Sequence, residues 1–338
     1  MIRVTMKFPK INSEEQEAVV IFFCQKVDLK ILLTAFIDSI KAGSPTNSTI
    51  FWVSQKPREI AQKFNQKYEQ IISNGSVKRL LKELGYGYRK QSKTLATGIY
   101  CNRNAQFEII TMLILAMSLQ SPVISMDCKK KERLGNLYRD GKCYSQEPLK
   151  VFDHDYDHLS EGKVIPHGIY DLQFNKGYIT LGKSAETAKF VTDNLLWWWT
   201  EYGIHLYPDA QNILLLCDAG GANSYRHHIF KNKLLELTKE IGISFIVAHY
   251  PPYSSKWNPI EHRLFCHIHH AMSGVVFTDY NIIKERIEST TTKTGLQVFV
   301  RINETIYLTG IRGNKEINTD TRIKNHIKIP ELNYRIYP

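Results

Sequence analysis

Two continuous apolar runs, each followed by an aspartate, are the clearest features of the hydrophobic pattern. Residues 122–126 precede Asp127, and residues 213–217 precede Asp218. Short apolar runs without polar alternation are typical of strands that are buried on both faces of a sheet. We therefore expect both aspartates at strand ends, which is where ligands bind in open α/β sheets.

Strand and helix patterns alternate from about residue 105 onward, which predicts a mixed α/β domain built on a central sheet. Further strands are expected over residues 164–170, 178–181 and 243–248. Helices are expected over 104–119, over 234–241, and from a cap at Ser184 through three consecutive tryptophans to a stop at Gly203. We expect the tryptophans, residues 197–199, to be core residues.

A third carboxylate follows the Pro-rich loop over residues 250–258. Asn258 is a residue type that caps helices, and Pro259 suits the first helical position. Together they place Glu261 in the first turn of a helix, with Ile260 and Leu264 available to anchor that helix against the sheet. Its side chain can then point back toward the strand ends, so the three carboxylates are expected to converge.

Three converging carboxylates repel one another unless cations neutralise them. Hard oxygen ligands favour Mg²⁺ or Mn²⁺ over zinc. Two such ions, about 4 Å apart, can activate an attacking oxygen and stabilise the leaving oxygen of a phosphodiester. The pattern therefore predicts a phosphoryl-transfer site in which Asp127, Asp218 and Glu261 are both the catalytic residues and the ligands of two Mg²⁺ or Mn²⁺ ions.

Two short helical patterns over residues 56–68 and 73–84 predict a helix-turn-helix, with Ser73 as the cap of the second helix and Gly85 as its end. Basic side chains on its other surfaces and in the following tail are expected to bind DNA: Lys78, Arg79, Lys82, Arg89 and Lys90. An ordinary helical hairpin with solvated basic residues is the alternative.

Charge and cysteine content narrow the class of partner and compartment. The 338-residue chain carries 44 Lys and Arg against 33 Asp and Glu, a net charge of +11, which favours a polyanionic partner such as nucleic acid. No secretory signal or membrane span is readable, since the apolar stretch over residues 18–37 is interrupted by charged residues. The six cysteines form no CxxC pair, which argues against a zinc ribbon and a disulfide framework and fits a reducing cytoplasm.

Other polar clusters near the acids have weaker signals. Four residues that flank the catalytic loops are expected to contact DNA: Arg226, Lys256, His262 and Arg263. The lysines at 129–131 could equally be solvated. The acidic stretch 152–158 lacks the glycine and glutamate of a calcium loop, and the histidines after Glu261 lack a zinc-type partner set, so neither is expected to hold a metal.

Several segments resemble the Rhodopirellula-type (ISAzo-type) DDE transposases of bacterial insertion sequences. The resemblance covers roughly residues 51–338, and its clearest motifs are residues 125–132, 165–171, 217–226, 250–265, 290–296 and 332–334. It implies an RNase H-like catalytic core whose first aspartate, second aspartate and glutamate fall on Asp127, Asp218 and Glu261. It also implies that residues 72–86 belong to a DNA-binding helix-turn-helix.

The resemblance implies a metal-dependent transposase that cuts and joins double-stranded DNA at insertion-sequence ends and in target DNA. Such a protein is expected to act as a homo-oligomer on DNA, in the bacterial cytoplasm at the nucleoid. A nuclease of the same fold without strand transfer, or a catalytically inactive DNA-binding relic, are the alternatives. The expected organisation is an unassigned segment, a small all-α helix-turn-helix domain, the catalytic domain and a C-terminal extension, over residues 1–50, 51–95, 96–290 and 291–338.

Overall fold

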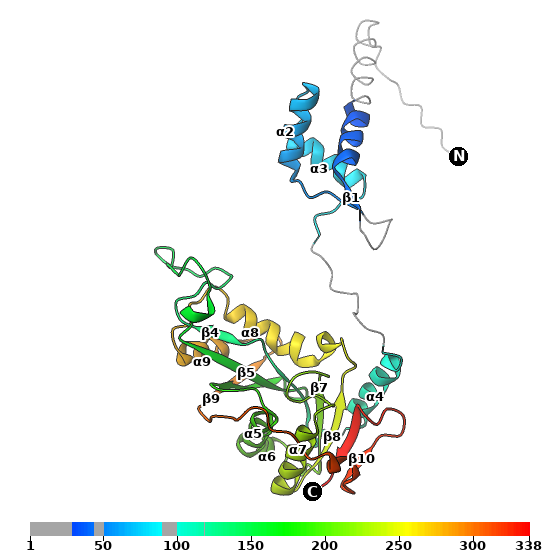
Figure 1. The fold of residues 1–338 in the computed structure, drawn as a ribbon, viewed down its shortest axis with the longest axis vertical. Helices are drawn as coiled ribbons and strands as arrows, with labels where there is room; N and C mark the ends of the chain where they lie inside the picture. The colour runs from blue at the N-terminus through cyan, green and yellow to red at the C-terminus, as the bar shows by residue number, and fades with distance from the viewer. Residues whose placement is uncertain (1–28, 44–50, 90–99, 118) are drawn as a thin grey trace, which may run out of the picture. The chain divides into compact units, whose positions relative to one another are not determined.

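The computed structural model describes residues 29–43, 51–89, 100–117 and 119–338, and the chain divides into two compact units, Met1–Thr94 and Leu95–Pro338 (Figure 1). Each unit has a hydrophobic core of its own. Lys90, one of the expected DNA-binding residues, lies outside the described residues. Among the described helices, none combines the length and the apolar character that a membrane span requires.

Within residues 29–43 and 51–89, the regular structure of the N-terminal unit is helical apart from one pair of two-residue strands. Residues 29–40 are helical, and α2 (Pro57–Tyr68) and α3 (Asn74–Glu83) follow. Between the helix over residues 29–40 and α2, strand β1 (Ala42–Gly43) pairs antiparallel with strand β2 (Phe51–Trp52). The three helices share one core, which consists of Leu33, Phe36, Ile37, Ile60, Ala61, Phe64, Ile72, Val77 and Leu80. The helix before residue 43, which the sequence pattern separates from the following helices, is therefore part of the same unit.

The second of the expected helices begins and ends where its sequence predicts. Ser73 Oγ accepts a hydrogen bond from the Ser76 amide at 3.1 Å, which satisfies one free donor of the first turn of α3. Gly85 follows the helix with a φ of +82°, a conformation that favours glycine. The turn between α2 and α3 is fixed by Asn65, whose side chain both donates to and accepts from the backbone of Ile72.

The C-terminal unit is built on one mixed sheet of nine strands within the described residues. The strands are β3 (Val123–Cys128), β4 (Glu132–Leu134), β5 (Gly162–Asp171), β6 (Lys176–Gly182), β7 (Asn212–Cys217), β8 (Ser244–His249), β9 (Gln297–Asn303), β10 (Ile323–Asn325) and β11 (Asn333–Ile336). Their order is β10-β11-β8-β7-β3-β5-β6-β9, with β4 paired to β5. Strands β3, β7 and β8 are parallel, β5 runs antiparallel to β3 and β6, and β9 is parallel to β6.

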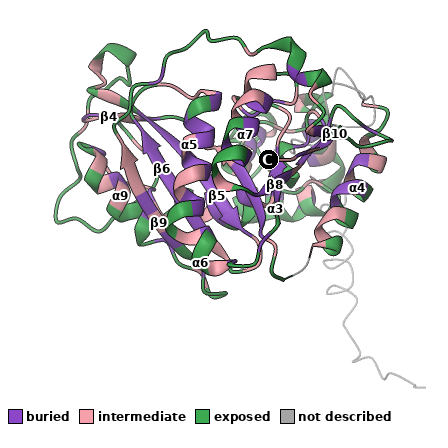
Figure 2. Ribbon diagram, turned by 90° about the horizontal axis from the view of Figure 1, so that it is seen from below, coloured by how far each residue is buried: buried purple, intermediate pink, exposed green. Residues whose placement is uncertain are grey.

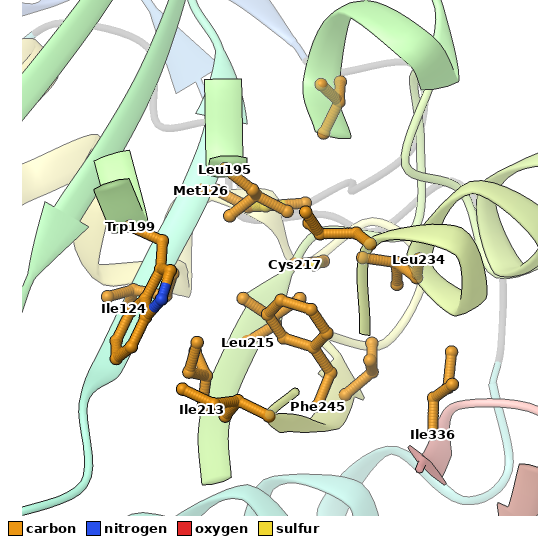
Figure 3. Close-up of a cluster of buried hydrophobic side chains, with 14 of the residues drawn as sticks. Ile124, Met126, Leu195, Trp199, Ile213, Leu215, Cys217, Leu234, Phe245 and Ile336 are labelled. Atoms are coloured by element: carbon orange, nitrogen blue, oxygen red, sulfur yellow. The ribbon is translucent and has the colours of Figure 1, made fainter. Parts of the chain in front are cut away.

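Helices cover both faces of this sheet and leave its central strands buried (Figure 2). One face packs against α5 (Ala188–Trp198) and α7 (His228–Ile241), and the other packs against α4 (Arg103–Ala116), α8 (Cys266–Ala271) and α9 (Tyr280–Glu288). Strand β7 shows why its pattern is continuously apolar. Ile213, Leu215 and Cys217 join the core beneath α5 and α7 (Figure 3), whereas Leu214 and Leu216 join the core beneath α4.

Two expectations about the helix after β6 are wrong. Thr187, and not Ser184, caps α5: its hydroxyl accepts from the Phe190 amide at 3.2 Å. Ser184 instead donates to the Thr305 carbonyl. The helix also passes Gly203, because a π-helical segment (Trp199–Gly203) continues directly into α6 (Ile204–Leu206). The tryptophans are core residues as expected, with Trp198 and Trp199 buried and Trp197 packed against them.

The segment after residue 290 is integrated into the sheet. Strand β9 extends the sheet beyond β6, and β11 pairs antiparallel with β8 through residue pairs such as Asn333 with Ala248. In α4, the first helix of the C-terminal unit, Gln106 donates to the His249 carbonyl at 2.8 Å and exchanges hydrogen bonds with Asn333. The C-terminal strands therefore support the strand that lies next to β7.

Candidate active site

The register of the central strands brings the two aspartates together. Strand β3 pairs parallel with β7, and Met126 lies opposite Cys217. The residues that directly follow this pair are Asp127 and Asp218. Asp127 is still within β3, one residue further into the strand than the sequence predicts, while Asp218 directly follows β7. The Asp127 carboxylate accepts a hydrogen bond from the Cys128 amide at 2.7 Å. Two neighbouring parallel strands thus present carboxylates at the same edge.

A buried polar network attaches the segment before Glu261 to β3. Asn258 Nδ2 donates to the Met126 carbonyl at 3.3 Å, and the Ser125 hydroxyl donates to Asn258 Oδ1. The same Ser125 oxygen accepts from the Ile260 amide at 3.0 Å. Asn258 is therefore not a side-chain cap of its own helix, which corrects the sequence-based expectation; its side chain instead binds the strand that carries Asp127.

The helical segment that carries Glu261 starts with an unusual turn. Pro259 and Ile260 are helical, and Glu261–Phe265 form a π-helical segment that continues into α8. Single π turns inside helices are often found at functional sites. Ile260 and Leu264 are fully buried, as expected for residues that anchor the helix.

Two glycines of the sheet let this helix approach closely. A Cβ at Gly168 of β5 would lie 2.6 Å from the Phe265 ring, and a Cβ at Gly177 of β6 would lie 2.5 Å from the Leu264 side chain. Any larger residue at either position would push the helix outward. The close contact therefore sets the distance between the sheet and the helical segment that carries Glu261.

The three carboxylates interact electrostatically in every pairing. Burial, together with the charges of Asp218 and Glu261 and against a lowering by the Cys128 amide, raises the pKa of Asp127 to about 8. Burial, together with the charge of Glu261 and against a lowering by the Gly220 amide, raises the pKa of Asp218 to about 6. The Asp127 and Glu261 carboxyls lie within hydrogen-bonding reach of each other. In the described residues, no Lys or Arg forms an ion pair with any of the three.

His249 and Tyr334 support the backbone at Asp218, a role that the hydrophobic pattern does not predict for either residue. His249 Nδ1 lies 3.1 Å from the Asp218 carbonyl, and its Nε2 lies 3.2 Å from the Tyr334 hydroxyl. Burial lowers the pKa of His249 to about 4, so the ring is neutral at pH 7. These contacts assign Nδ1–H as the donor to Asp218 and Nε2 as the acceptor from Tyr334.

A fourth carboxylate, Glu186, lies near the other three. It belongs to the short connection between β6 and α5, and its Oε1 accepts a hydrogen bond from the Ala222 amide at 3.3 Å. Together with burial, its negative charge raises the pKa of the Cys128 thiol and of Asp218. Glu186, Cys128 and Glu261 line the same cavity of about 1150 Å³.

The basic residues near the acids divide into paired and unpaired ones. Lys129 pairs with Glu132, as does Arg139 at 2.7 Å, so Lys129 is committed to a structural ion pair. The residues expected to contact DNA in this unit are all solvent-exposed: Arg226, Lys256, His262 and Arg263. Four of the five in the N-terminal unit are also exposed: Lys78, Arg79, Lys82 and Arg89.

The donor set suits a hard divalent cation. Carboxylate oxygens are the preferred ligands of Mg²⁺ and Mn²⁺, and the pKa of Asp127 is raised by burial and by the neighbouring charges of Asp218 and Glu261. Within the described residues, no three His, Cys, Asp or Glu side chains already form a closed metal-binding group. The three carboxylates fit such an ion by the chemistry of their oxygen atoms.

The comparison with protein families decides the identity. The family described as the Rhodopirellula transposase DDE domain matches residues 32–338. The chain belongs to this family. It is thus a DDE transposase, a metal-dependent enzyme that cleaves DNA and transfers the cut strand. The match begins at residue 32, so residues 32–50, which we expected to lie outside the resemblance, are part of it.

Solved structures similar to this DDE transposase include three Mos1 complexes. The Mos1 transposase paired-end complex with left transposon end has 14% identity and a TM-score of 0.43. The pre-cleavage Mos1 transpososome has 15% and 0.44, and the Mos1 mariner paired end complex with Mn has 15% and 0.42. Each alignment covers 84% of this chain and 72% of the other. No curated protein matches the chain.

Proposed function

We propose that Asp127, Asp218 and Glu261 are the catalytic carboxylates of this transposase and that they bind two Mg²⁺ or Mn²⁺ ions. The observation that carries the proposal is the convergence of three acids from β3, the end of β7 and the π turn, without an ion-pairing Lys or Arg in the described residues. Such a cluster is costly unless cations bind it. Bound metal would activate the attacking oxygen and stabilise the leaving oxygen of a phosphodiester.

The residues of the chain have separate roles in this proposal. Asp127 and Asp218 hold the shared centre of the site because their strands are adjacent and parallel. Glu261 completes the site from the helical segment after residue 258. The hydrogen bonds of Ser125 and Asn258 fix the position of the segment that leads to Glu261. His249 holds the backbone of Asp218 without adding charge.

An RNase H-like core is part of the same proposal. The five strands β6-β5-β3-β7-β8 are adjacent in this order, and only β5 runs against the others. This arrangement supports the core that the family resemblance implies. It places Asp127 on the central strand and Asp218 on its neighbour.

We also propose that double-stranded DNA is bound by both units and that the enzyme acts on it as a homo-oligomer. Helix α3, with Lys78, Arg79 and Lys82 exposed, would enter the DNA groove as the second helix of a helix-turn-helix, while Arg226 and Lys256 would contact phosphates near the scissile bond. Arg226 and Lys256 are exposed, and each lies over a neighbouring aromatic ring, Arg226 over Tyr225 and Lys256 over Trp257.

The proposal is tested by isosteric loss of each charge. In Asp127→Asn, Asp218→Asn and Glu261→Gln, nicking and strand transfer on DNA that carries the element ends should fall together, while each variant stays folded and its gel-shift affinity stays near the parent value. Parent-like cleavage by Glu261→Gln would exclude it as a metal ligand. Cleavage without joining in the parent protein would favour a nuclease, and absence of both with intact DNA binding would favour an inactive relic.

A further inference from the structure

The connection between β6 and α5 places Glu186 beside the loop that follows Asp218. Its Oε1 accepts a hydrogen bond from the Ala222 amide of that loop at 3.3 Å. The same side chain lines a cavity together with Cys128, the residue after Asp127. Glu186 therefore holds the loop that follows β7.

The backbone turns at Gly221 directly beside Glu186. A Cβ at Gly221 would lie 2.9 Å from Glu186 Oε1, and Gly221 has a φ of +68°, which side chains rarely adopt. Gly221 thus has a specific reason here, because its φ lets the backbone turn beneath a carboxylate. Gly220 also donates its amide to the Asp218 carboxylate at 3.3 Å. The loop is held at one end by Asp218 and at the other by Glu186.

Glu186 has no basic partner of its own among the described ion pairs, although it is only partly exposed and faces the cavity shared with Glu261. A carboxylate kept for stability alone would gain most from a nearby Lys or Arg. At this position it adds negative charge to an acidic site. Its hydrogen bond to the loop after Asp218 accounts for its place there.

We propose that Glu186 is a positioning residue that sets the position of Asp218 by accepting a hydrogen bond from Ala222, in the loop that follows this aspartate. This inference rests on the proposed role of the three carboxylates. It adds a residue outside that set, which acts through the loop after Asp218 and need not contact the metal. Partners of this kind around metal ligands typically change metal affinity or activity by about 10-fold to 100-fold when they are removed.

The test compares Glu186→Ala with Glu186→Gln in the full-length protein. The glutamine keeps an oxygen that can accept from the Ala222 amide, while alanine removes it. Hydrogen exchange of residues 219–222 should accelerate in metal-free Glu186→Ala and remain close to the parent in Glu186→Gln. In Mn²⁺ titrations by calorimetry, Glu186→Ala should bind about 10-fold more weakly, with the glutamine variant closer to the parent. Glu240→Gln, on the exposed end of α7, is the matched control.

A double-mutant cycle with Gly221→Ala separates positioning from general destabilisation. The added Cβ meets Glu186 Oε1, so Gly221→Ala should weaken Mn²⁺ binding less in the Glu186→Ala background than in the parent. Additive effects, unchanged exchange in Glu186→Ala, or a glutamine variant as impaired as alanine would each overturn the positioning role. Failure of the catalytic proposal is distinguished by Asp127→Asn: if that variant binds Mn²⁺ like the parent, the metal site is misassigned, whereas the exchange result at residues 219–222 still tests the contact of Glu186 with this loop.

Discussion

Asn258 donates its side-chain amide to the backbone carbonyl of Met126, the residue directly before Asp127. This single contact connects the loop that leads to Glu261 with the strand that carries the first aspartate. Ser125 completes the connection, because its hydroxyl donates to Asn258 and accepts from the Ile260 amide. All of these groups are buried, so their hydrogen bonds have no water to replace them. The position of Glu261 relative to Asp127 is therefore fixed by groups that are not themselves acidic.

Replacing Ser125 should affect both stability and catalysis. Ser125→Ala leaves Asn258 Oδ1 and the Ile260 amide without their partner, and an unsatisfied buried group costs about 1–3 kcal/mol. We expect a lower melting temperature and a lower nicking rate, measured on the same preparation. Ser289→Ala is the control, since that hydroxyl is exposed and bonds only within its own helix end. A stable variant with parent activity would show that this network does not position Glu261.

The acidic cluster should make the metal-free protein less stable as pH rises. Burial raises the pKa of Asp127 to about 8 and that of Asp218 to about 6, so the folded protein binds more protons than the unfolded chain between pH 4 and these values. Stability contributed by these groups is therefore present at low pH and lost as pH rises through the folded pKa. In EDTA, the melting temperature of Asp127→Asn should exceed that of the parent by an amount that grows from pH 4 to pH 8.

Two controls make this pH prediction specific. Asp209→Asn changes an exposed aspartate, so its melting curve should follow that of the parent at every pH. Added Mg²⁺ should raise the melting temperature of the parent but have less effect on Asp127→Asn. Parallel pH profiles for the parent and Asp127→Asn would contradict the convergence of the carboxylates.

His249 should have the opposite pH signature. Burial lowers its pKa to about 4, so folding disfavours its protonation between pH 4 and about 6.5, its ordinary value. At pH 7, His249→Ala removes the partners of the Asp218 carbonyl and the Tyr334 hydroxyl and should cost about 1–3 kcal/mol in unfolding experiments. That loss should shrink as pH falls from 6.5 toward 4, because the parent then carries the cost of a buried imidazolium. A pH-independent loss would argue against a neutral, buried ring.

Basic residues of α3 should control the salt dependence of DNA binding. Lys78→Ala, Arg79→Ala and Lys82→Ala should each weaken binding of double-stranded DNA, and each lost phosphate contact should reduce the slope of log affinity against log salt by about 1. The measurement is a salt series of gel shifts with full-length protein. Lys239→Ala, an exposed residue of α7, should leave the slope unchanged. Parent-like slopes in all three variants would favour an ordinary helical hairpin with solvated cations.

The sequence predicts the two aspartates well because their environment is continuous along the chain. Residues 213–217 are apolar without interruption since alternate side chains enter different cores on the two faces of the sheet. The parallel pairing of β3 with β7 then follows the usual rule that strand ends gather at one edge. Asp127 and Asp218 could therefore be placed from local pattern alone.

The rest of the site depends on contacts between distant residues. Asn258 is a residue type that commonly caps helices, yet its side chain binds Met126 and Ser125, which lie 132 and 133 positions earlier in the chain. Ser184 and Thr187 are both cap-type residues, and only the contact of Ser184 with Thr305 and Tyr307 decides that Thr187 is the cap. Glu186 lies between them in a polar stretch that has no periodicity. Local pattern cannot rank such residues, because their partners are chosen by the tertiary fold.

The pairing of β6 with β9 sets a limit on how fast the enzyme can mature. Thr180 and Arg301 are register partners in this parallel ladder, although 121 residues separate them along the chain. Long-range parallel pairing forms slowly because the entropy of closing the intervening loop must be lost first. Until β9 docks, one edge of β6 is open to strands from other chains, so aggregation competes with folding during overexpression. Slow synthesis at low temperature should therefore raise the yield of this transposase more than stabilising its catalytic centre would.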